Sequence, residues 1–258
     1  MKNTILSEKD AKIIEKIILR FGRIVSAENL MKVFAEEGYS EGSAHNRIQT
    51  IYKAGWFLRI KKGLYLIIEN LTSRSISDMS LLLIARAIHK ESYISLHSAL
   101  NYYQMFDQYT KTVVSVNYEI SRKYKFENHE FHFVKIAKKY FFGFTQIRQD
   151  GKLVNIAFKE KALIDFLYLD KSFYSASLVF EKIRDNKNEI DFIKLQDYAL
   201  KYGVSIQRKI GFILDQVGVD SSRLLENVKQ QKGFSKFTKE SKIFNTKWRI
   251  YYDDRIIK

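Results

Sequence analysis

The spacing of apolar residues changes once within residues 1–68, and this change limits the folds that the segment can adopt. Up to Gly55 the apolar side chains recur every three or four residues in three stretches, separated at Gly22 and Gly38, which predicts three short amphipathic helices. A serine able to cap a helix precedes each stretch: Ser7, Ser26, and either Ser40 or Ser43. After Gly55 the sequence WFLRIKKGLYLII forms two short β-like runs around a Lys-Lys-Gly turn, which predicts a hairpin. Three helices followed by a hairpin is the order of a winged helix-turn-helix.

The rest of the chain mixes helical and β-like patterns without an internal repeat. Residues 69–78, ENLTSRSISD, are polar and aperiodic, so we expect a linker between a winged domain at 1–68 and a C-terminal domain at 79–258. Helical patterns cover 79–90, 95–105, 159–169, 175–185, 191–202 and 205–217, three of them opened by Ser95, Asp191 and Ser205. β-like patterns cover 112–118, 130–136, 153–158 and 246–252. The sequence therefore predicts a mixed α+β fold, in which a small sheet surrounded by helices follows the winged domain.

The charge of the chain favours a polyanionic partner. Its 258 residues include 44 Lys and Arg against 29 Asp and Glu, giving a net charge of +15 and a pI near 9.6, which suits nucleic acid. The excess is highest at the two ends, because residues 1–68 carry 12 basic and 7 acidic groups and residues 229–258 carry 9 and 3. An AT-rich genome also enriches Lys, so composition alone leaves both interpretations open.

Cysteine is absent, and the N-terminus does not read as a targeting segment. Without cysteine, disulfides, thiolate metal sites and cysteine nucleophiles are excluded. The first residues, MKNTILSEKDAKIIEK, are charged throughout and lack the apolar core of a signal peptide. No run approaches the ~20 apolar residues of a membrane span. We therefore expect a cytoplasmic protein with no membrane partner.

One face of the third predicted helix carries side chains that can read DNA. The apolar residues at 44, 48, 51 and 52 define its buried side, so the opposite side presents Ser43, Asn46, Arg47, Thr50 and Lys53. Asn can pair bidentately with adenine and Arg with guanine, while Ser, Thr and Lys reach bases or backbone. In helix-turn-helix docking, this helix enters the major groove.

The hairpin adds three cations, Arg59, Lys61 and Lys62, which are placed to contact phosphates or an adjacent minor groove. No carboxylate lies on the polar helix face or in the hairpin through residue 68. We therefore expect the N-terminal domain to bind double-stranded DNA. The alternatives are that the charged helix face is merely solvated, or that the winged helix serves as a protein-interaction module.

Several short segments, through their order and spacing, resemble the AbiEi family of bacterial antitoxins and transcriptional regulators. Besides the N-terminal unit they are YISLHSALNYYQM (93–105), TVVSVN (112–117), KEKALIDFLYL (159–169), RKIGFILDQVG (208–218) and NTKWRIYYD (245–253). The resemblance implies a winged-helix domain that represses its own operon by binding promoter DNA at inverted repeats. It also implies a C-terminal domain that counteracts a nucleotidyltransferase-like toxin. In this type IV arrangement, the antitoxin opposes the toxin's effect without necessarily forming a stable complex.

Carried over by position, the resemblance assigns roles to two sets of residues. The DNA-reading role falls on Arg47, Lys53, Arg59, Lys61 and Lys62. The antitoxin role falls on Ser95, Ser98, Glu160, Lys161, Asp165, Arg208 and Trp248. Structural roles stay open for the second set: a helix cap for Ser95, a solvated helix face for Asp165, a helix start for Glu160 and Lys161, and a core position in the strand at 246–252 for Trp248.

Two further readings stay open beside the antitoxin. The chain could be a stand-alone regulator whose C-terminal domain senses a ligand, or a subunit that tethers a partner to DNA.

The basic end at 229–258 is more positively charged than we expect for a surface that contacts only protein. Its Lys236, Lys239 and Lys242 suggest a second nucleic-acid contact.

The catalytic patterns are weak, so we expect no enzyme, no metal and no cofactor. Asp220 with Glu240-Ser-Lys242 has the spacing of a metal-dependent nuclease core, but a Glu-x-Lys match is expected by chance in so Lys-rich a chain. His129 and His132 lie three apart in a predicted strand and point to opposite faces, which disfavours a shared metal. A nucleotidyltransferase would need a Gly-Ser step ahead of an Asp-x-Asp pair, and these do not occur in that order. No G-x-S-x-G nucleophile elbow is present either.

Overall fold

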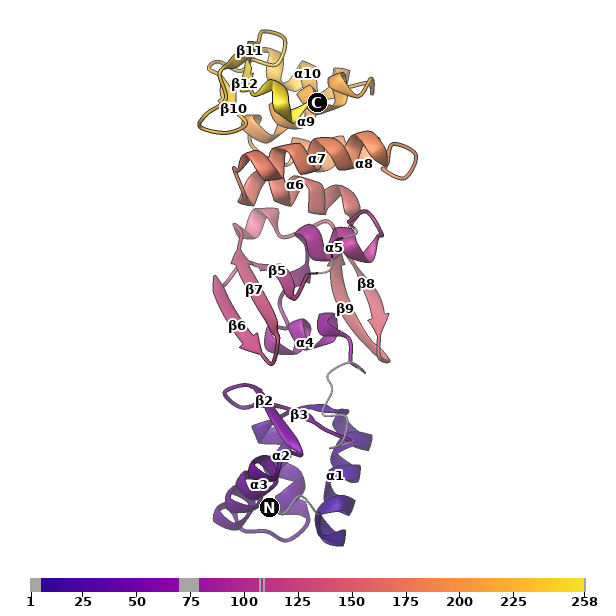
Figure 1. Ribbon diagram of the computed structural model, residues 1–258, viewed down its shortest axis with the longest axis vertical. Helices are drawn as coiled ribbons and strands as arrows, with labels where there is room; N and C mark the ends of the chain where they lie inside the picture. Colours follow the sequence, from indigo (N-terminus) through magenta and orange to yellow (C-terminus); the bar gives the residue numbers. More distant parts are fainter. Residues whose placement is uncertain (1–5, 70–78, 107, 109, 258) are drawn as a thin grey trace. The chain divides into compact units, whose positions relative to one another are not determined.

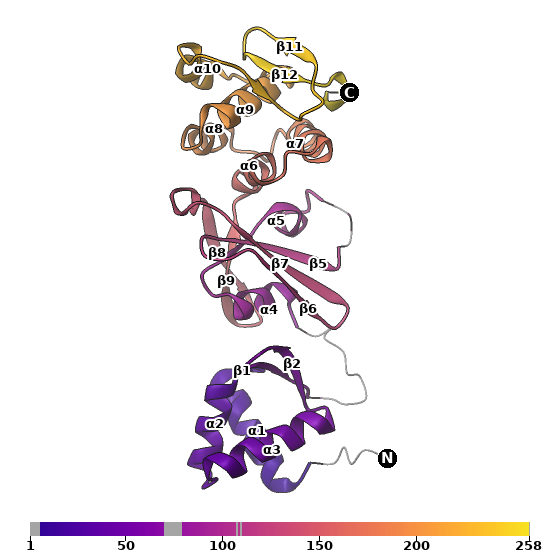
Figure 2. The same cartoon turned by 90° about the vertical axis from the view of Figure 1, so that its left-hand side faces the viewer.

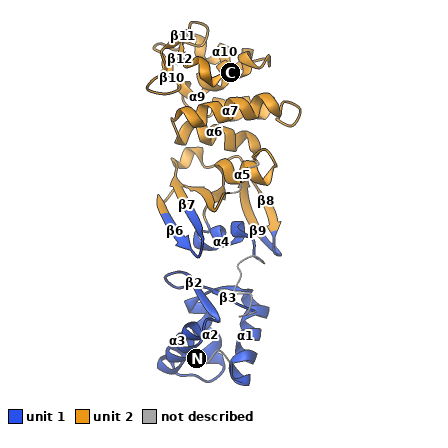
Figure 3. Ribbon diagram, viewed as in Figure 1, with its two compact units in different colours: residues 1–90, 123–131, 149–152 blue, residues 91–122, 132–148, 153–258 orange. Residues whose placement is uncertain are grey.

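The computed structural model describes residues 6–69, 79–106, 108 and 110–257, and the chain divides into two compact units (Figure 3). Unit 1 comprises residues 1–90, 123–131 and 149–152, and unit 2 comprises residues 91–122, 132–148 and 153–258. The predicted linker at 69–78 lies outside the described residues except for Glu69.

Unit 1 contains a helical bundle and a small sheet (Figure 1). Its elements before the linker are α1 (Glu8–Phe21), β1 (Ile24–Ser26), α2 (Ala27–Glu36), α3 (Glu41–Ala54), β2 (Phe57–Lys61) and β3 (Leu64–Ile67), and α4 (Leu81–Ile88) follows it. The predicted serine caps are confirmed, because Ser7, Ser26 and Ser40 each accept a hydrogen bond from the backbone N–H three residues on. Gly55 ends α3 with a φ of 93°, a left-handed conformation that lacks strain only in glycine. The predicted order of three helices and a hairpin is confirmed.

The strand β1 completes the small sheet and has no counterpart in the sequence prediction. The strand order is β1-β3-β2, and β3 pairs antiparallel with both neighbours. Apolar side chains from α1, α2, α3 and the hairpin meet in one core beside this sheet, including Ile17, Leu30, Phe34, Ile51 and Phe57. Because α3 buries Ala44, Ile48 and Ile51 in that core, its polar side faces outward.

Among the described residues, a six-stranded sheet has the order β6-β7-β5-β4-β9-β8. Its strands are β4 (Tyr93–Ile94), β5 (Thr112–Asn117), β6 (Arg122–Phe126), β7 (His129–Lys135), β8 (Phe144–Gln149) and β9 (Lys152–Ala157), and α5 (Leu96–Tyr102) follows β4. The two-residue strand β4 pairs antiparallel with β5 and parallel with β9, so it joins the two halves of the sheet. The strands predicted at 112–118, 130–136 and 153–158 are confirmed as β5, β7 and β9.

Helices and a second small sheet form the rest of unit 2. They are α6 (Lys159–Leu169), α7 (Phe173–Asp185), α8 (Phe192–Leu200), α9 (Val204–Gln216), α10 (Ser222–Lys229), β10 (Ser235–Lys236), β11 (Ile243–Asn245) and β12 (Ile250–Tyr252), with single 3-10 turns η2 (Lys138–Tyr140) and η3 (Asp254–Ile256). In the small sheet β12 lies in the middle, parallel to β10 and antiparallel to β11. Figure 2 shows this sheet close to α9.

Three expectations about unit 2 are corrected. Gly203, not Ser205, is the N-cap residue of α9. The strand predicted at 246–252 is β12 alone, and Trp248 lies in the turn between β11 and β12. This turn forms because the Trp248 backbone N–H donates to Asn245 Oδ1 at 2.9 Å, which closes the chain on itself. Ser95 precedes α5 as expected, but its side chain makes no capping hydrogen bond.

Candidate functional site

The outward side of α3 presents four of the predicted DNA-reading residues to solvent: Ser43, Asn46, Thr50 and Lys53. The Asn46 side chain has no hydrogen-bond partner among the described residues, so its amide oxygen and nitrogen are both open to a ligand. Thr50 Oγ1 donates to the Asn46 carbonyl oxygen at 2.9 Å, which fixes the hydroxyl against the helix. Of these four side chains, Asn46 therefore keeps both a donor and an acceptor open.

Arg47, the fifth residue of the predicted face, is held by a buried carboxylate. Its Nε donates to Asp10 Oδ1 at 2.7 Å, and its Nη2 donates to Asp10 Oδ2 and, at 3.4 Å, to Ser7 Oγ. Burial raises the pKa of Asp10, but the hydrogen bonds from Arg47 and Ser7 outweigh it and leave that pKa below its usual value. The guanidinium thus ties α3 to the start of α1.

The hairpin cations differ in how they are held. Arg59, in β2, and Lys62, in the turn after it, are exposed. Lys61 is half-buried, and its Nζ donates to the Ile88 carbonyl oxygen at 2.6 Å. Of the three cations predicted to contact phosphates, Arg59 and Lys62 therefore extend into solvent while Lys61 is bonded within unit 1.

Ion pairing separates the α3 and hairpin cations from those of α1. Three cations of α1 are bound by carboxylates, in the pairs Lys12–Glu8, Lys16–Glu37 and Arg20–Glu36. Lys53, Arg59 and Lys62 have no carboxylate partner among the described residues. A surface whose cations are not neutralised attracts a polyanion more strongly than one whose cations are paired.

A buried polar network in unit 2 brings together three residues of the predicted antitoxin set. Lys161 and Asp165, one turn apart on α6, form an ion pair in which both side chains are fully buried. Ser95 Oγ donates to Asp165 Oδ2 at 2.7 Å. Two tyrosines that the sequence did not indicate complete the network: Tyr93 Oη donates to Asp165 Oδ2 at 3.1 Å, and Tyr202 Oη donates to Asp165 Oδ1 at 3.2 Å. The carboxylate therefore has four polar partners.

The network holds its charges without contact to water. The Lys161 ammonium also donates to Tyr93 Oη at 2.8 Å and lies over the rings of Tyr93, Phe142 and Tyr202, with its Nζ 5.2 to 5.6 Å from their centroids. Burial lowers the pKa of Lys161, and the Asp165 carboxylate opposes that shift. Burial and Asp165 both raise the pKa of Tyr93 and Tyr202 well above the usual value, so both phenols stay protonated donors.

The remaining residues of the antitoxin set are buried as well, each with a structural partner. Ser98 Oγ accepts from the Val114 backbone N–H at 2.9 Å, and Glu160 Oε1 accepts from the Asp191 backbone N–H at 3.1 Å. The Arg208 guanidinium donates to the Gln231 carbonyl oxygen at 2.9 Å. Trp248 is fully buried, and its Nε1 donates to Asp215 Oδ2 at 2.8 Å. All seven residues of the predicted set thus lie inside unit 2.

Separation along the chain explains why sequence reasoning missed Tyr93 and Tyr202. Tyr93 precedes Ser95 in a two-residue strand, and Tyr202 lies just after α8, too far along the chain from α6 for any spacing rule to link them. The Lys161 and Asp165 spacing of four residues was the one local signal, because it places both side chains on one side of α6.

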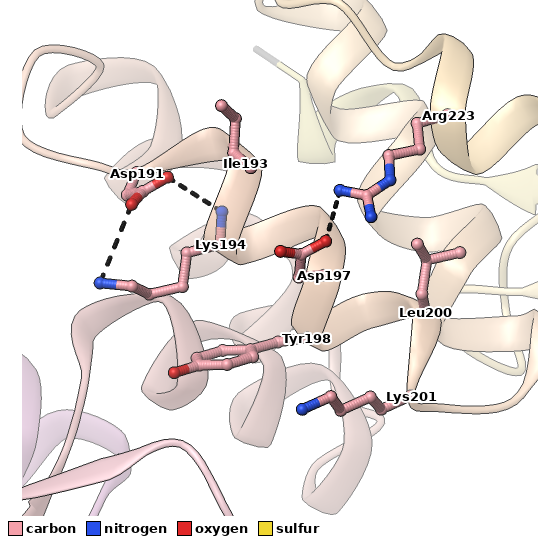
Figure 4. Close-up of a pocket in the computed structure, with 8 residues that line it drawn as sticks. All are labelled: Asp191, Ile193, Lys194, Asp197, Tyr198, Leu200, Lys201 and Arg223. Carbon is pink, nitrogen blue, oxygen red and sulfur yellow. Dashed lines mark hydrogen bonds and ion pairs between the residues drawn. The ribbon is translucent and has the colours of Figure 1, made fainter.

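A surface hollow of about 630 Å³ lies along α8 and α10 (Figure 4). Its two carboxylates are already neutralised, because Lys194 pairs with Asp191 at 3.8 Å and Arg223 pairs with Asp197. Tyr198 and Lys201 complete its polar lining, and the Lys201 Nζ lies over the Tyr198 ring. Both carboxylates of the hollow are thus paired with cations.

The residues of the nuclease alternative do not form a described metal centre. The Asp220 carboxylate accepts from the Ser222 backbone N–H at 3.1 Å and from the Ser222 hydroxyl at 3.0 Å, an arrangement that supports the start of α10. Within the described ranges, no group of three or more His, Asp or Glu side chains converges closely enough to hold a metal ion. None of the described helices combines the length and apolar composition needed to cross a bilayer.

The chain resembles a solved structure over nearly its whole length. It matches the crystal structure of the RV2827C protein from Mycobacterium tuberculosis with a TM-score of 0.64, and the match covers 98% of this chain and 94% of that chain. The sequence identity is 12%, so the likeness concerns the fold. No protein-family model and no curated protein matches the sequence. The two proteins thus share a mixed α+β fold, in which a winged helix-turn-helix is followed by a larger region of helices and sheets.

Proposed function

We propose that this protein is a DNA-binding regulator in which unit 1 binds double-stranded promoter DNA through α3 and the β2–β3 hairpin. One observation carries the proposal: the exposed side of α3 and the β2–β3 hairpin hold Lys53, Arg59 and Lys62 without carboxylate partners among the described residues, and α3 also presents the unpaired amide of Asn46. Cations and an amide are the groups that contact phosphates and adenine in the major groove.

The proposed roles follow from how each side chain is held. Asn46, with Ser43 beside it on the helix, reads base edges, and Lys53, Arg59 and Lys62 contact phosphates. Arg47 and Lys61 have structural roles and do not contact DNA directly, because Asp10 and the Ile88 carbonyl bind their charged groups. Arg47 sets the position of α3 against α1, and with it the angle at which α3 meets the groove.

The DNA-binding proposal is tested with the protein's own upstream DNA. Lys53→Gln and Lys62→Gln are expected to weaken binding to every sequence and to lower the slope of log K against log salt by about one each. Asn46→Ala is expected to cost about 1–3 kcal/mol and to relax sequence preference. The matched control is Lys12→Gln, which removes an exposed cation that Glu8 already pairs. Wild-type affinity in all three test variants, at several salt concentrations, contradicts the proposal.

For the whole chain we propose an AbiEi-type antitoxin that represses its own operon and counteracts a nucleotidyltransferase-like toxin, with no enzymatic activity of its own. This part rests on the motif resemblance and is compatible with the fold. Co-expression tests it: the adjacent gene is induced with and without the full chain, and with a full chain carrying Asn46→Ala and Lys53→Gln. Rescue of growth by both forms assigns neutralisation to unit 2. A neighbouring gene without toxicity leaves the stand-alone regulator as the better assignment.

A further inference from the structure

The outer face of the small C-terminal sheet carries a row of side chains that spans its strands. Lys236 in β10 pairs with Tyr251 in β12, and Tyr251 pairs with Phe244 in β11. Side chains directly opposite each other in paired strands point to the same face of a sheet. The Lys236 Nζ lies 5.1 Å from the Tyr251 ring centroid, and the Phe244 and Tyr251 centroids are 4.9 Å apart.

A third aromatic ring extends this row. Phe234, just before β10, packs edge to face on Tyr251 with a centroid distance of 5.2 Å. Phe234 is 61% exposed and Phe244 is 43% exposed, so both rings present much of their surface to solvent. We call Phe234, Lys236, Phe244 and Tyr251 the aromatic face.

The aromatic face is not needed to close the core. The opposite side of the same sheet packs against the core, because Ile250 is fully buried and Tyr252 packs on Phe212 of α9 with a centroid distance of 4.7 Å. Phe237, which follows β10, also packs on Phe212 at 5.6 Å. The outer rings are therefore exposed although burying them would be favourable, which is typical of a binding surface.

Charge decides what kind of partner suits this surface. Residues 229–258 carry 9 basic and 3 acidic groups. Besides Lys236, the side chains of Lys239, Lys242 and Arg249 are exposed, against one exposed acidic side chain, Glu240; the Asp253 carboxylate is held by Arg255 at 2.6 Å. Exposed aromatic rings with a cation packed against them are a combination that binds unpaired bases and their phosphates, since every base has a face that stacks on a ring.

We propose that the aromatic face binds single-stranded nucleic acid, with bases stacking on Phe234 and Phe244 and a phosphate contacting Lys236. A duplex does not fit the same surface, because its bases are already stacked on one another and leave no face for the rings. This site is separate from α3 and the hairpin, and it goes beyond the proposed binding of promoter DNA.

The test measures fluorescence anisotropy of the full chain with labelled oligo(U) and oligo(dT) of about 12 nucleotides. Phe234→Ala and Phe244→Ala are each expected to weaken binding about 5- to 150-fold, the loss of one stacked base. Lys236→Gln is expected to reduce the slope of log K against log salt by about 0.7. The matched control is Tyr174→Ala, which removes an aromatic ring that is 54% exposed on α7, outside the aromatic face.

Two results support the proposal and distinguish its sources: equal affinity for oligo(U) and oligo(dT) indicates stacking alone, and preference for oligo(U) indicates an added contact to the 2′-hydroxyl. Absence of binding at low salt overturns it, as does unchanged affinity in Phe234→Ala and Phe244→Ala with native circular dichroism. Asn46→Ala is expected to leave oligonucleotide affinity unchanged. Failure of promoter binding by unit 1 is thus distinguishable from failure of this inference.

Discussion

Removing one charge of the Lys161–Asp165 pair is expected to destabilise unit 2 more than removing both. In Lys161→Met the Asp165 carboxylate keeps its three hydroxyl donors but loses its cation, and in Asp165→Asn the ammonium loses its anion. Breaking one partner of a buried pair costs about 3–5 kcal/mol. The double variant keeps an amide oxygen to accept from the hydroxyls, so it should cost less than either single variant, which places it at least about 3 kcal/mol below the sum of the single costs.

The pH dependence separates the two single variants. Without Asp165 the Lys161 ammonium has a folded-state pKa lowered by burial and no carboxylate to oppose it. The unfolded chain then binds the proton more tightly, so the stability of Asp165→Asn rises with pH up to about 10.4, the ordinary pKa of lysine. Lys161→Met has no titrating amine at this position and should show no such recovery.

Urea denaturation of the full chain measures both effects. The chain has two tryptophans, and in a Trp56→Phe background Trp248 reports on unit 2 alone. Lys194→Met serves as the control, because its pair with Asp191 is partly exposed to solvent and worth about 0–1 kcal/mol. Single variants that cost less than about 1 kcal/mol, or a double variant whose cost equals their sum, would refute this account of the pair.

Three further predictions concern other buried contacts. Among the described residues, buried Lys209 has no carboxylate partner and donates to two backbone carbonyls at 3.3 and 3.5 Å, and burial lowers its pKa to about 8. Because the folded-state pKa is lowered, the stability of the wild type rises between pH 8 and 10.5. Lys209→Met should therefore be more stable than the wild type by up to about 3 kcal/mol at pH 7. In urea titrations this difference should disappear near pH 10.5. Gly211→Ala should destabilise rather than bring the ~1 kcal/mol gain usual in a helix, because its Cβ would lie 2.1 Å from the Trp248 ring; thermal denaturation gives the sign. Asp10→Ala should cost unit 1 about 1.5–3 kcal/mol, because the half-buried Arg47 guanidinium loses its buried hydrogen-bond partner. Because the folded pKa of Asp10 is lowered, that difference should be present above pH 4 and disappear as the pH falls through the lowered pKa, measured by Trp56 fluorescence.

The N-terminal fold follows from the sequence because its signals are local. Apolar spacing defines the helix faces, and Ser7, Ser26 and Ser40 mark three helix starts. The strand β1 was missed because it has only three residues and is defined by its pairing with β3, which follows α2 and α3 in the sequence. A partner so distant along the chain leaves no periodic trace in three residues.

The candidate sites were harder to predict because residue type does not reveal burial. Ser95 precedes a helix as a capping serine should, yet its hydroxyl bonds to Asp165 on α6. Arg47 lies on the polar side of α3, but its guanidinium donates to the Asp10 carboxylate of α1. Both outcomes depend on a carboxylate from another element, and only the packing of those elements brings it within reach.

Burial changes how mutations in unit 2 have to be interpreted. The seven residues that the family resemblance assigns to toxin neutralisation lie inside the unit, so none of them offers a surface that a partner can touch. Loss of neutralisation in Lys161→Met could therefore result from unfolding alone. A Lys161→Met/Asp165→Asn double variant that regains stability but not neutralisation would exclude unfolding as the cause. Phe234→Ala and Phe244→Ala avoid this ambiguity, because their rings are exposed on a sheet face that the core does not use. If they abolish rescue from the toxin while the thermal stability is unchanged, neutralisation depends on the aromatic face and not on the buried network.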